Sequence, residues 1–148
     1  DYHMQVTRAG EYAIIGLLYL AKQPEGRTVM IDEISEAERV PKSFLAKIFQ
    51  SLAKAGFVRS QRGAHGGFSL ARPAAEVSLL QILNCVERDF ALQKCVGEEP
   101  ACVVAPERLG SCVLCGVFAE AQRRVNEVFA GTTLADLIAR AGPAVMVS

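Results

Sequence analysis

The sequence predicts a mainly α-helical fold with one small β-hairpin. Apolar residues recur at helical spacing over most of the chain, one short stretch alternates around a glycine-rich tip, and a long helical pattern follows an irregular segment. The chain has 148 residues, of which 51% are hydrophobic and 22% charged. This is an ordinary globular composition with room for one domain and an appended element, and it excludes an intrinsically disordered chain.

The sequence also carries expectations about location. No uncharged apolar run reaches the roughly 18 residues that a membrane-spanning helix needs, and the opening residues do not look like a secretory signal. We therefore expect a cytoplasmic protein with no membrane partner. Residues 1–3 precede Met4, and the His-Met junction is typical of a cloning site, so we treat these residues as a remnant.

The first half of the chain predicts successive helices, expected over residues 7–21, 31–39 and 42–55. Thr7 is a suitable N-cap for the first helix and Asp32 for the second. Pro41 breaks the pattern before the third helix, and Gly56 follows that helix where a glycine commonly ends one. The apolar face of the third helix is expected to point inward and consists of Phe44, Leu45, Ile48, Phe49 and Leu52.

The next part of the chain changes to the spacing of a β-hairpin. Strands are expected over residues 57–62 and 68–71, joined by the glycine-rich tip Gly63-Ala-His-Gly-Gly67. Another helix is expected over residues 78–87, with Ser78 as its N-cap. The order helix, helix, short turn, helix and glycine-tipped hairpin is the layout of a winged helix-turn-helix.

The last third of the chain predicts a long loop and then helices. Residues 91–111 have no usable period, and loops of about twenty residues in a compact domain are usually functional or disordered. Helical spacing returns from Val113 to Ala130 and stops at Gly131. A last short helix is expected to run through Ala139.

Charge is distributed unevenly along a chain whose formal net charge is zero. The stretch from residue 39 to residue 72 contains no acidic residue and seven basic ones, namely Arg39, Lys42, Lys47, Lys54, Arg59, Arg62 and Arg72. Such a stretch indicates a polyanionic partner such as nucleic acid. The alternative is a solvated face whose counter-charges lie elsewhere in the fold.

A winged helix-turn-helix assigns DNA-contacting roles to particular residues. The second helix of the pair enters the major groove, and the exposed residues near its amino-terminal end reach base edges. Glycines at the hairpin tip allow a close approach to DNA, although a simple hairpin turn also explains them. The predicted DNA-contacting residues are Lys42, Ser43, Lys47, Arg59, Arg62, His65, Gly66 and Gly67.

The five cysteines fall into two groups. Cys85 lies within a helical pattern and is expected to be a core thiol. The other cysteines are Cys95, Cys102, Cys112 and Cys115, separated by six, nine and two residues. Without a secretory signal, clustered thiolates favour a metal over disulfides. A closed zinc site typically uses two short hooks, and only Cys112-x-x-Cys115 forms one, so the spacing favours an iron–sulfur cluster, with zinc as the alternative.

An enzyme is not expected. A small thiol oxidoreductase acting through Cys112 and Cys115 would need a βαβ context, which the pattern lacks. The only histidines are His3 and His65, so no Ser/His/Asp set is apparent.

Together these motifs resemble a family of bacterial transcription regulators, the IscR/NsrR-type or Rrf-type winged-helix regulators. The hairpin motif Arg62-Gly-Ala-His-Gly-Gly-Phe68 is similar to the family's wing. The other similar segments are residues 4–14, 34–36, 40–58 and 131–137.

The resemblance implies a homodimer on palindromic double-stranded DNA, with the long helix at the dimer interface. It implies an iron–sulfur cluster, 2Fe–2S or 4Fe–4S, that alters DNA affinity in response to redox state, nitric oxide or iron supply. The family's three loop cysteines fall on Cys95, Cys102 and Cys112. The fourth ligand is Cys115, which we favour, or Glu11 reaching from the first helix of the partner subunit. A zinc-stabilised or cluster-free DNA-binding repressor is the alternative function.

This resemblance divides the chain after the remnant at residues 1–3. The parts are a winged helix-turn-helix DNA-binding domain (4–90), a cysteine-rich cluster loop (91–112), and a dimerisation helix followed by a C-terminal helix (113–148).

Overall fold

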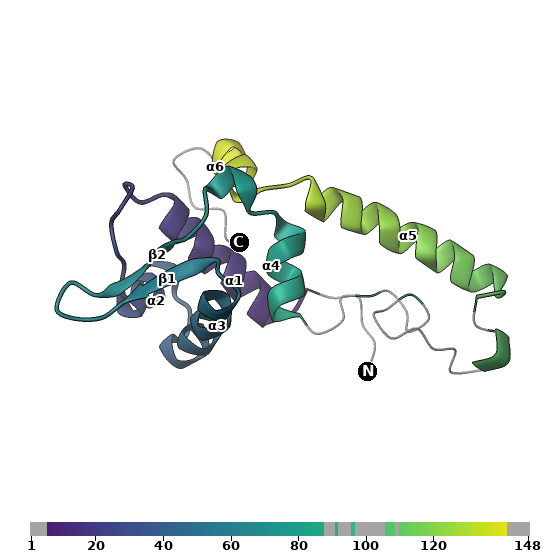
Figure 1. Cartoon of the computed structure of the whole chain (residues 1–148), viewed down its shortest axis with the longest axis horizontal. Helices are drawn as coiled ribbons and strands as arrows, with labels where there is room; N and C mark the ends of the chain where they lie inside the picture. Colours follow the sequence, from purple (N-terminus) through teal and green to yellow (C-terminus); the bar gives the residue numbers. More distant parts are fainter. Residues whose placement is uncertain (1–5, 88–90, 92–95, 97–105, 109, 142–148) are drawn as a thin grey trace.

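The structure is a computed structural model that describes residues 6–87, 91, 96, 106–108 and 110–141. Its elements are α1 (Arg8–Ala21), α2 (Ile31–Glu38), α3 (Lys42–Lys54), β1 (Val58–Gln61), β2 (Gly67–Leu70), η1 (Ala74–Glu76), α4 (Leu79–Val86), η3 (Pro106–Arg108), α5 (Val113–Ala130) and α6 (Leu134–Ala141). Figure 1 shows α1 to α4, the hairpin and α6 grouped together, with α5 extending away from them. The winged helix-turn-helix with a long additional helix is confirmed.

The amino-terminal end of α1 is capped from two sides. The Thr7 hydroxyl accepts the N–H of Gly10 at 3.3 Å, as the sequence predicts. The carboxylate of Glu87, just after α4, accepts the backbone N–H of Thr7 at 2.9 Å and its hydroxyl at 2.7 Å. A negative charge at a helix amino terminus is favourable. These contacts fasten the end of α4 to the start of α1.

The turn between α2 and α3 is tight. Arg39 ends α2 with φ of 56°, in the left-handed region. The Ser35 hydroxyl donates to the carbonyl oxygen of Val40 at 2.6 Å, and Pro41 is the N-cap of α3. The expected cap by Asp32 is wrong, because α2 begins at Ile31 with no side-chain cap.

The hairpin is joined to the rest of the domain by a third strand-like segment. β1 and β2 are antiparallel, with Val58 opposite Leu70 and Gln61 opposite Gly67. The backbone of Val29, in the α1–α2 connection, exchanges hydrogen bonds of 2.8 and 2.7 Å with that of Phe68. A single paired residue leaves no periodic signal, so the sequence pattern did not predict this contact.

Phe49 of α3 lies at the centre of the core. It is fully buried, and its ring meets that of Phe68 of β2 edge-on, with centroids 5.1 Å apart. On another side the ring lies against Gly16 of α1, where an added Cβ would come within 2.6 Å of it. The absence of a side chain at Gly16 therefore lets α1 and α3 approach closely.

The two carboxyl-terminal helices behave differently. α6 returns to α1 and η1, and its Leu134 is fully buried in the core. α5 has the bounds that the sequence predicts, and it carries exposed Val113, Leu114, Val117 and Val128. No described helix is long and apolar enough to cross a membrane.

We predict that Gly16→Ala destabilises the domain. Alanine raises helix propensity by about 1 kcal/mol over glycine, but the new methyl overlaps a buried ring, and overpacking of this kind costs about 1–3 kcal/mol. The expected result is a net loss in the free energy of unfolding, measured by chemical denaturation. In a Phe49→Leu background the cost of Gly16→Ala should shrink, and an equal cost in both backgrounds would contradict the packing argument.

Candidate nucleic-acid interface and cysteine site

One face of α3 is packed and the other is free. Its inward side chains are Leu45, Ile48, Phe49 and Leu52, all buried. Ser43 and Lys47, the predicted base-reading residues, are exposed at the amino-terminal half of the helix. Among the described residues no acidic side chain forms an ion pair with Lys47. The exposed face of α3 therefore presents a hydroxyl and an available ammonium group.

Two of the basic residues in the acid-free stretch interact with other residues of the domain. The Lys42 ammonium lies 2.6 Å from the Asp32 carboxylate, in an exposed ion pair. Arg72 donates to the carbonyl oxygen of Ala55 at 3.0 Å, and its guanidinium lies 4.5 Å from the centre of the Phe57 ring. Arg72 thus ties the end of α3 to the hairpin. An exposed pair such as Lys42–Asp32 contributes little stability, so Lys42 remains able to contact a phosphate.

The predicted contact residues of the wing project from the hairpin. Arg59 on β1 is exposed, as are Arg62 and His65 in the tip. Figure 1 shows the hairpin reaching beyond α2 and α3 at one end of the molecule. The wing therefore offers cations at a distance from those of α3, as contact with two parts of a duplex requires.

Gly66 and Gly67 have a role in the hairpin itself. A Cβ on Gly66 would lie 2.4 Å from the carbonyl oxygen of Gln61, and one on Gly67 would lie 2.5 Å from that of Val29. Gly67 also has φ of 142°, in the region that favours glycine. The hairpin geometry alone accounts for both glycines, and their contact with DNA stays a prediction.

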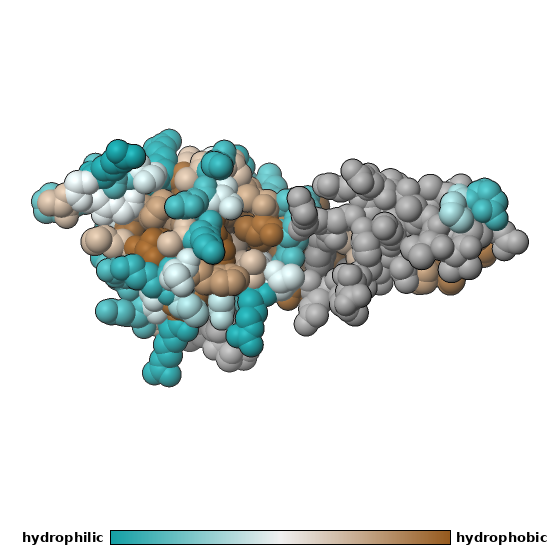
Figure 2. All heavy atoms as spheres, turned by 90° about the horizontal axis from the view of Figure 1, so that it is seen from below, coloured by the Kyte–Doolittle hydropathy of each residue, from teal (hydrophilic) through white to brown (hydrophobic). Residues whose placement is uncertain are grey.

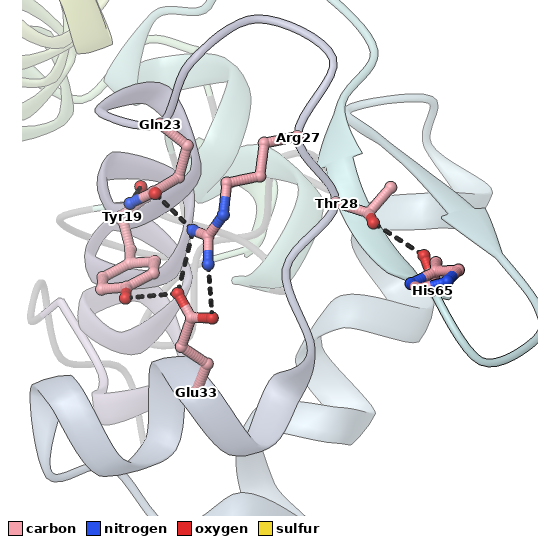
Figure 3. A network of polar contacts seen from close by, with 6 residues as sticks. All are labelled: Tyr19, Gln23, Arg27, Thr28, Glu33 and His65. Atoms are coloured by element: carbon pink, nitrogen blue, oxygen red, sulfur yellow. Dashed lines mark hydrogen bonds and ion pairs between the residues drawn. The ribbon is translucent and has the colours of Figure 1, made fainter.

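A polar network holds the α1–α2 connection in place (Figure 3). The Arg27 guanidinium binds the Glu33 carboxylate at 2.7 and 3.0 Å and also contacts the side chain of Gln23. The Tyr19 hydroxyl donates to Glu33 at 2.6 Å. These two donors lower the pKa of Glu33, and donation to the carboxylate raises the pKa of Tyr19. α1, α2 and the connection between them are thus joined at one carboxylate.

The same connection also holds the wing tip. The hydroxyl of Thr28, next to Arg27, donates to the carbonyl oxygen of His65 at 2.9 Å (Figure 3). Together with the pairing of Val29 and Phe68, this bond fixes the hairpin relative to α2. Thr28 was not among the predicted site residues, because its role depends on a contact between distant segments.

The sequence pattern placed Phe44 wrongly. Its spacing predicted an inward side chain, yet 41% of the residue is exposed, next to Ser43 on α3. Seen from the side of α3, the domain carries projecting hydrophilic side chains with smaller hydrophobic patches between them (Figure 2). An interface that mixes charge and apolar surface suits DNA, whose major groove displays both polar edges and methyl groups.

The cysteine site is described only in part. Cys112 is the N-cap of α5 and Cys115 lies in its first turn, both half-buried. Residues spaced by three lie on the same side of a helix, so the two thiols can serve one metal centre. Cys95 and Cys102 lie outside the described residues. Among the described residues no group of three potential metal ligands comes together.

The two other candidate residues, Glu11 and Cys85, lie in the helical domain. Glu11, the alternative fourth ligand, is exposed on α1. Cys85 is half-buried and packs against the core, with Sγ 3.8 Å from the carbonyl oxygen of Ser51 on α3. Burial raises the pKa of the Cys85 thiol, as expected for a structural cysteine rather than a ligand.

The helix pair, the exposed face of α3 and the wing define a winged helix-turn-helix DNA-binding protein. A sequence model of the Rrf2 family, described as iron-dependent transcriptional regulators, matches residues 6–140. The chain belongs to this family. It is therefore a transcriptional regulator that binds DNA, and not an enzyme.

Individual relatives agree with this assignment. Protein aau3 of Rhizobium meliloti is 36% identical over 137 residues, which cover 91% of this chain and 85% of that protein. A solved structure of T. potens IscR has a TM-score of 0.75 at 25% identity, covering 97% of this chain and 93% of that one. CymR, the global cysteine regulator of B. subtilis, has a TM-score of 0.71 at 22% identity, covering 92% of this chain and 97% of that one, and shows the same fold.

We predict that Thr28→Val weakens DNA binding through the wing. Loss of one hydrogen bond to the His65 carbonyl should lower affinity by about two- to tenfold, measured by fluorescence anisotropy on an operator selected from random duplexes. Thr132→Val removes a similar hydroxyl–carbonyl bond, 2.8 Å to Val128 on α5, and should leave affinity unchanged. In an Arg62→Ala background, Thr28→Val should cause little further loss of affinity. If it lowers affinity there as much as it does in the wild type, the bond does not act through the wing.

Proposed function

We propose that this regulator acts as a homodimer on a palindromic operator, and that an iron–sulfur cluster held by its cysteines controls its affinity for DNA. The proposed reading of DNA rests on one observation: the amino-terminal half of α3 has an exposed face, and the wing beside it is anchored to the domain. The cysteine pair at the start of α5 supports the control part. A protein that acts on operators works in the compartment that holds the chromosome, so we place it in the cytoplasm.

The DNA contacts follow from the exposed groups. Lys47 and Ser43 lie where a reading helix meets base edges, and a lysine there prefers guanine acceptors or a phosphate. Arg59 and Arg62 of the wing are positioned to bind phosphates or enter the minor groove. Phosphate contacts set the position of the protein, and base contacts set the sequence that it recognises.

The exposed stripe on α5 supports the homodimer. Leu114, Val117, Ala121 and Val128 follow spacings of three, four and seven, which place them along one side of the helix. Leu114, Val117 and Val128 are between 57% and 63% exposed. An apolar stripe at this spacing is typical of a helix that pairs with another helix. A second copy of α5 supplies the same stripe, and pairing would set the distance between two reading helices.

The donor set of the cysteine site suits a soft metal centre. Cys112 and Cys115 would hold the cluster together with Cys95 and Cys102, and Glu11 is the alternative to Cys115. Thiolates select iron–sulfur clusters or zinc, and a bound iron–sulfur cluster would supply a centre whose charge changes with oxidation state. Through Cys112 and Cys115 the cluster would be attached to the start of α5, the helix that we propose forms the dimer interface. A zinc-stabilised or cluster-free regulator is the second candidate.

We predict that Lys47→Ala lowers operator affinity by about five- to thirtyfold, the range expected for loss of one charged base or phosphate contact. If the contact is to a phosphate, the slope of log affinity against log salt should also become shallower by about one. The measurement is anisotropy over a salt series on the selected operator. Arg140→Ala removes an exposed charge on α6, which lies on the other side of the domain from α3 (Figure 1), and is the control. Unchanged binding in Lys47→Ala would overturn the assigned reading face.

We predict that protein purified without oxygen absorbs visible light and contains iron and sulfide. Cys112→Ala should remove this absorbance, whereas Cys85→Ala should retain it because Cys85 packs against the helical core. Cys115→Ala and Glu11→Gln separate the two choices of fourth ligand, since only the ligand's removal should bleach the cluster. A colourless protein with stoichiometric zinc, or with no metal, would contradict the cluster and leave the DNA-reading proposal standing.

A further inference from the structure

We propose that Phe44 reads a thymine methyl group in the major groove and so sets part of the operator sequence. This inference rests on the proposed docking of α3 in the groove. Phe44 stands out because it is a large apolar residue with 41% of its surface exposed on a helix whose other large apolar side chains are nearly or fully buried. Exposing an aromatic ring has a cost in water, and that cost disappears where the ring meets apolar surface.

The position of Phe44 is that of a base-reading residue. Ser43 directly precedes it, and Lys47 follows one turn later, so the ring borders the face that carries both polar readers. The amino-terminal turns of a reading helix lie deepest in the groove. The ring therefore lies within the part of α3 that would meet base edges.

The ring is also held in place before any DNA binds. Tyr12 of α1 meets it edge-on, with centroids 5.5 Å apart and an interplanar angle of 88°. The Tyr12 hydroxyl in turn accepts a hydrogen bond from the Arg8 guanidinium at 3.4 Å. A side chain fixed in this way loses little conformational freedom on binding, so its contact contributes more to affinity. Tyr12 is thus a positioning residue for Phe44.

The chemistry of the groove identifies the target. Among the base edges in the major groove, thymine alone offers a methyl group, and phenylalanine is among the side chains that contact it. A phenyl ring has no hydrogen-bond donor or acceptor to satisfy, so it discriminates by burying the methyl group. Removing that one methyl group should weaken binding by about three- to tenfold.

Replacement of thymine by uracil tests the inference, because uracil differs only by the missing methyl group. Each thymine of the selected operator is replaced in turn by deoxyuridine, and affinity is measured by anisotropy. The wild-type protein should lose about three- to tenfold affinity at one thymine in each half-site. Phe44→Ala should bind the original operator more weakly and show no further loss when that thymine becomes uracil.

Matched variants separate contact from folding. Phe44→Tyr keeps the ring and should keep the sensitivity to uracil, while Tyr12→Ala should reduce it by releasing the ring. Met30→Ala removes another large exposed apolar side chain, at the N-cap of α2, and should leave the uracil profile unchanged. Circular dichroism and thermal unfolding check that each variant is folded.

The outcomes also separate this inference from the proposed function. Equal sensitivity to uracil in wild type and Phe44→Ala, or no sensitive thymine in the wild type, would overturn the role of Phe44. If Lys47→Ala nevertheless weakens binding, the proposed docking of α3 is retained and only the role of Phe44 is rejected. If Lys47→Ala has no effect either, the docking itself is wrong.

Discussion

The buried ring of Phe49 is the contact on which the DNA-facing geometry depends. It joins the three parts that must keep a fixed arrangement, because it belongs to α3, meets Phe68 of the wing edge-on, and fills the space beside Gly16 of α1. Phe68 is in turn paired with Val29 through the backbone. A protein interior is packed as densely as a crystal, so a shift of this ring would move the reading helix and the wing together. Separate polar contacts then fix the tip of the wing.

Much of this fold could be predicted because it follows from local sequence patterns. The helices were predicted with bounds close to those observed. The signals were helical spacing, the caps Thr7 and Ser78, and the glycines after α3 and α5. The hairpin followed from its alternation and its glycine tip. What could not be predicted depends on contacts between distant segments. The pairing of Val29 with Phe68, the bond from Thr28 to His65 and the ion pair of Asp32 with Lys42 have no period that a single sequence reveals.

The candidate site could be predicted in outline, but the roles within it are mixed. The acid-free basic stretch covers α3 and the hairpin, the parts of a winged helix-turn-helix that meet DNA, yet Arg72 is used to brace Phe57 and Ala55. Gly66 and Gly67 are demanded by the hairpin's own backbone. Phe44 was misjudged for a related reason, since an apolar residue at the edge of a helical face fits the core pattern whether or not it is covered. Charge and periodicity identify a surface, whereas tertiary packing decides which of its residues remain available.

The proposed control by the cysteine site has a short physical route to the reading helix. The segment that carries Cys95 and Cys102 follows Glu87 in the sequence, and the Glu87 carboxylate binds Thr7 at the start of α1. One helical turn further on, Tyr12 supports Phe44 of α3. A change in this segment that displaces Glu87 would therefore act first on the turn of α1 that contacts α3. The same segment is followed in the sequence by α5, whose proposed pairing would set the spacing of two copies of α3. Because Glu87 precedes this segment and α5 follows it, a few kcal/mol of difference between two of its states would be enough to alter operator occupancy.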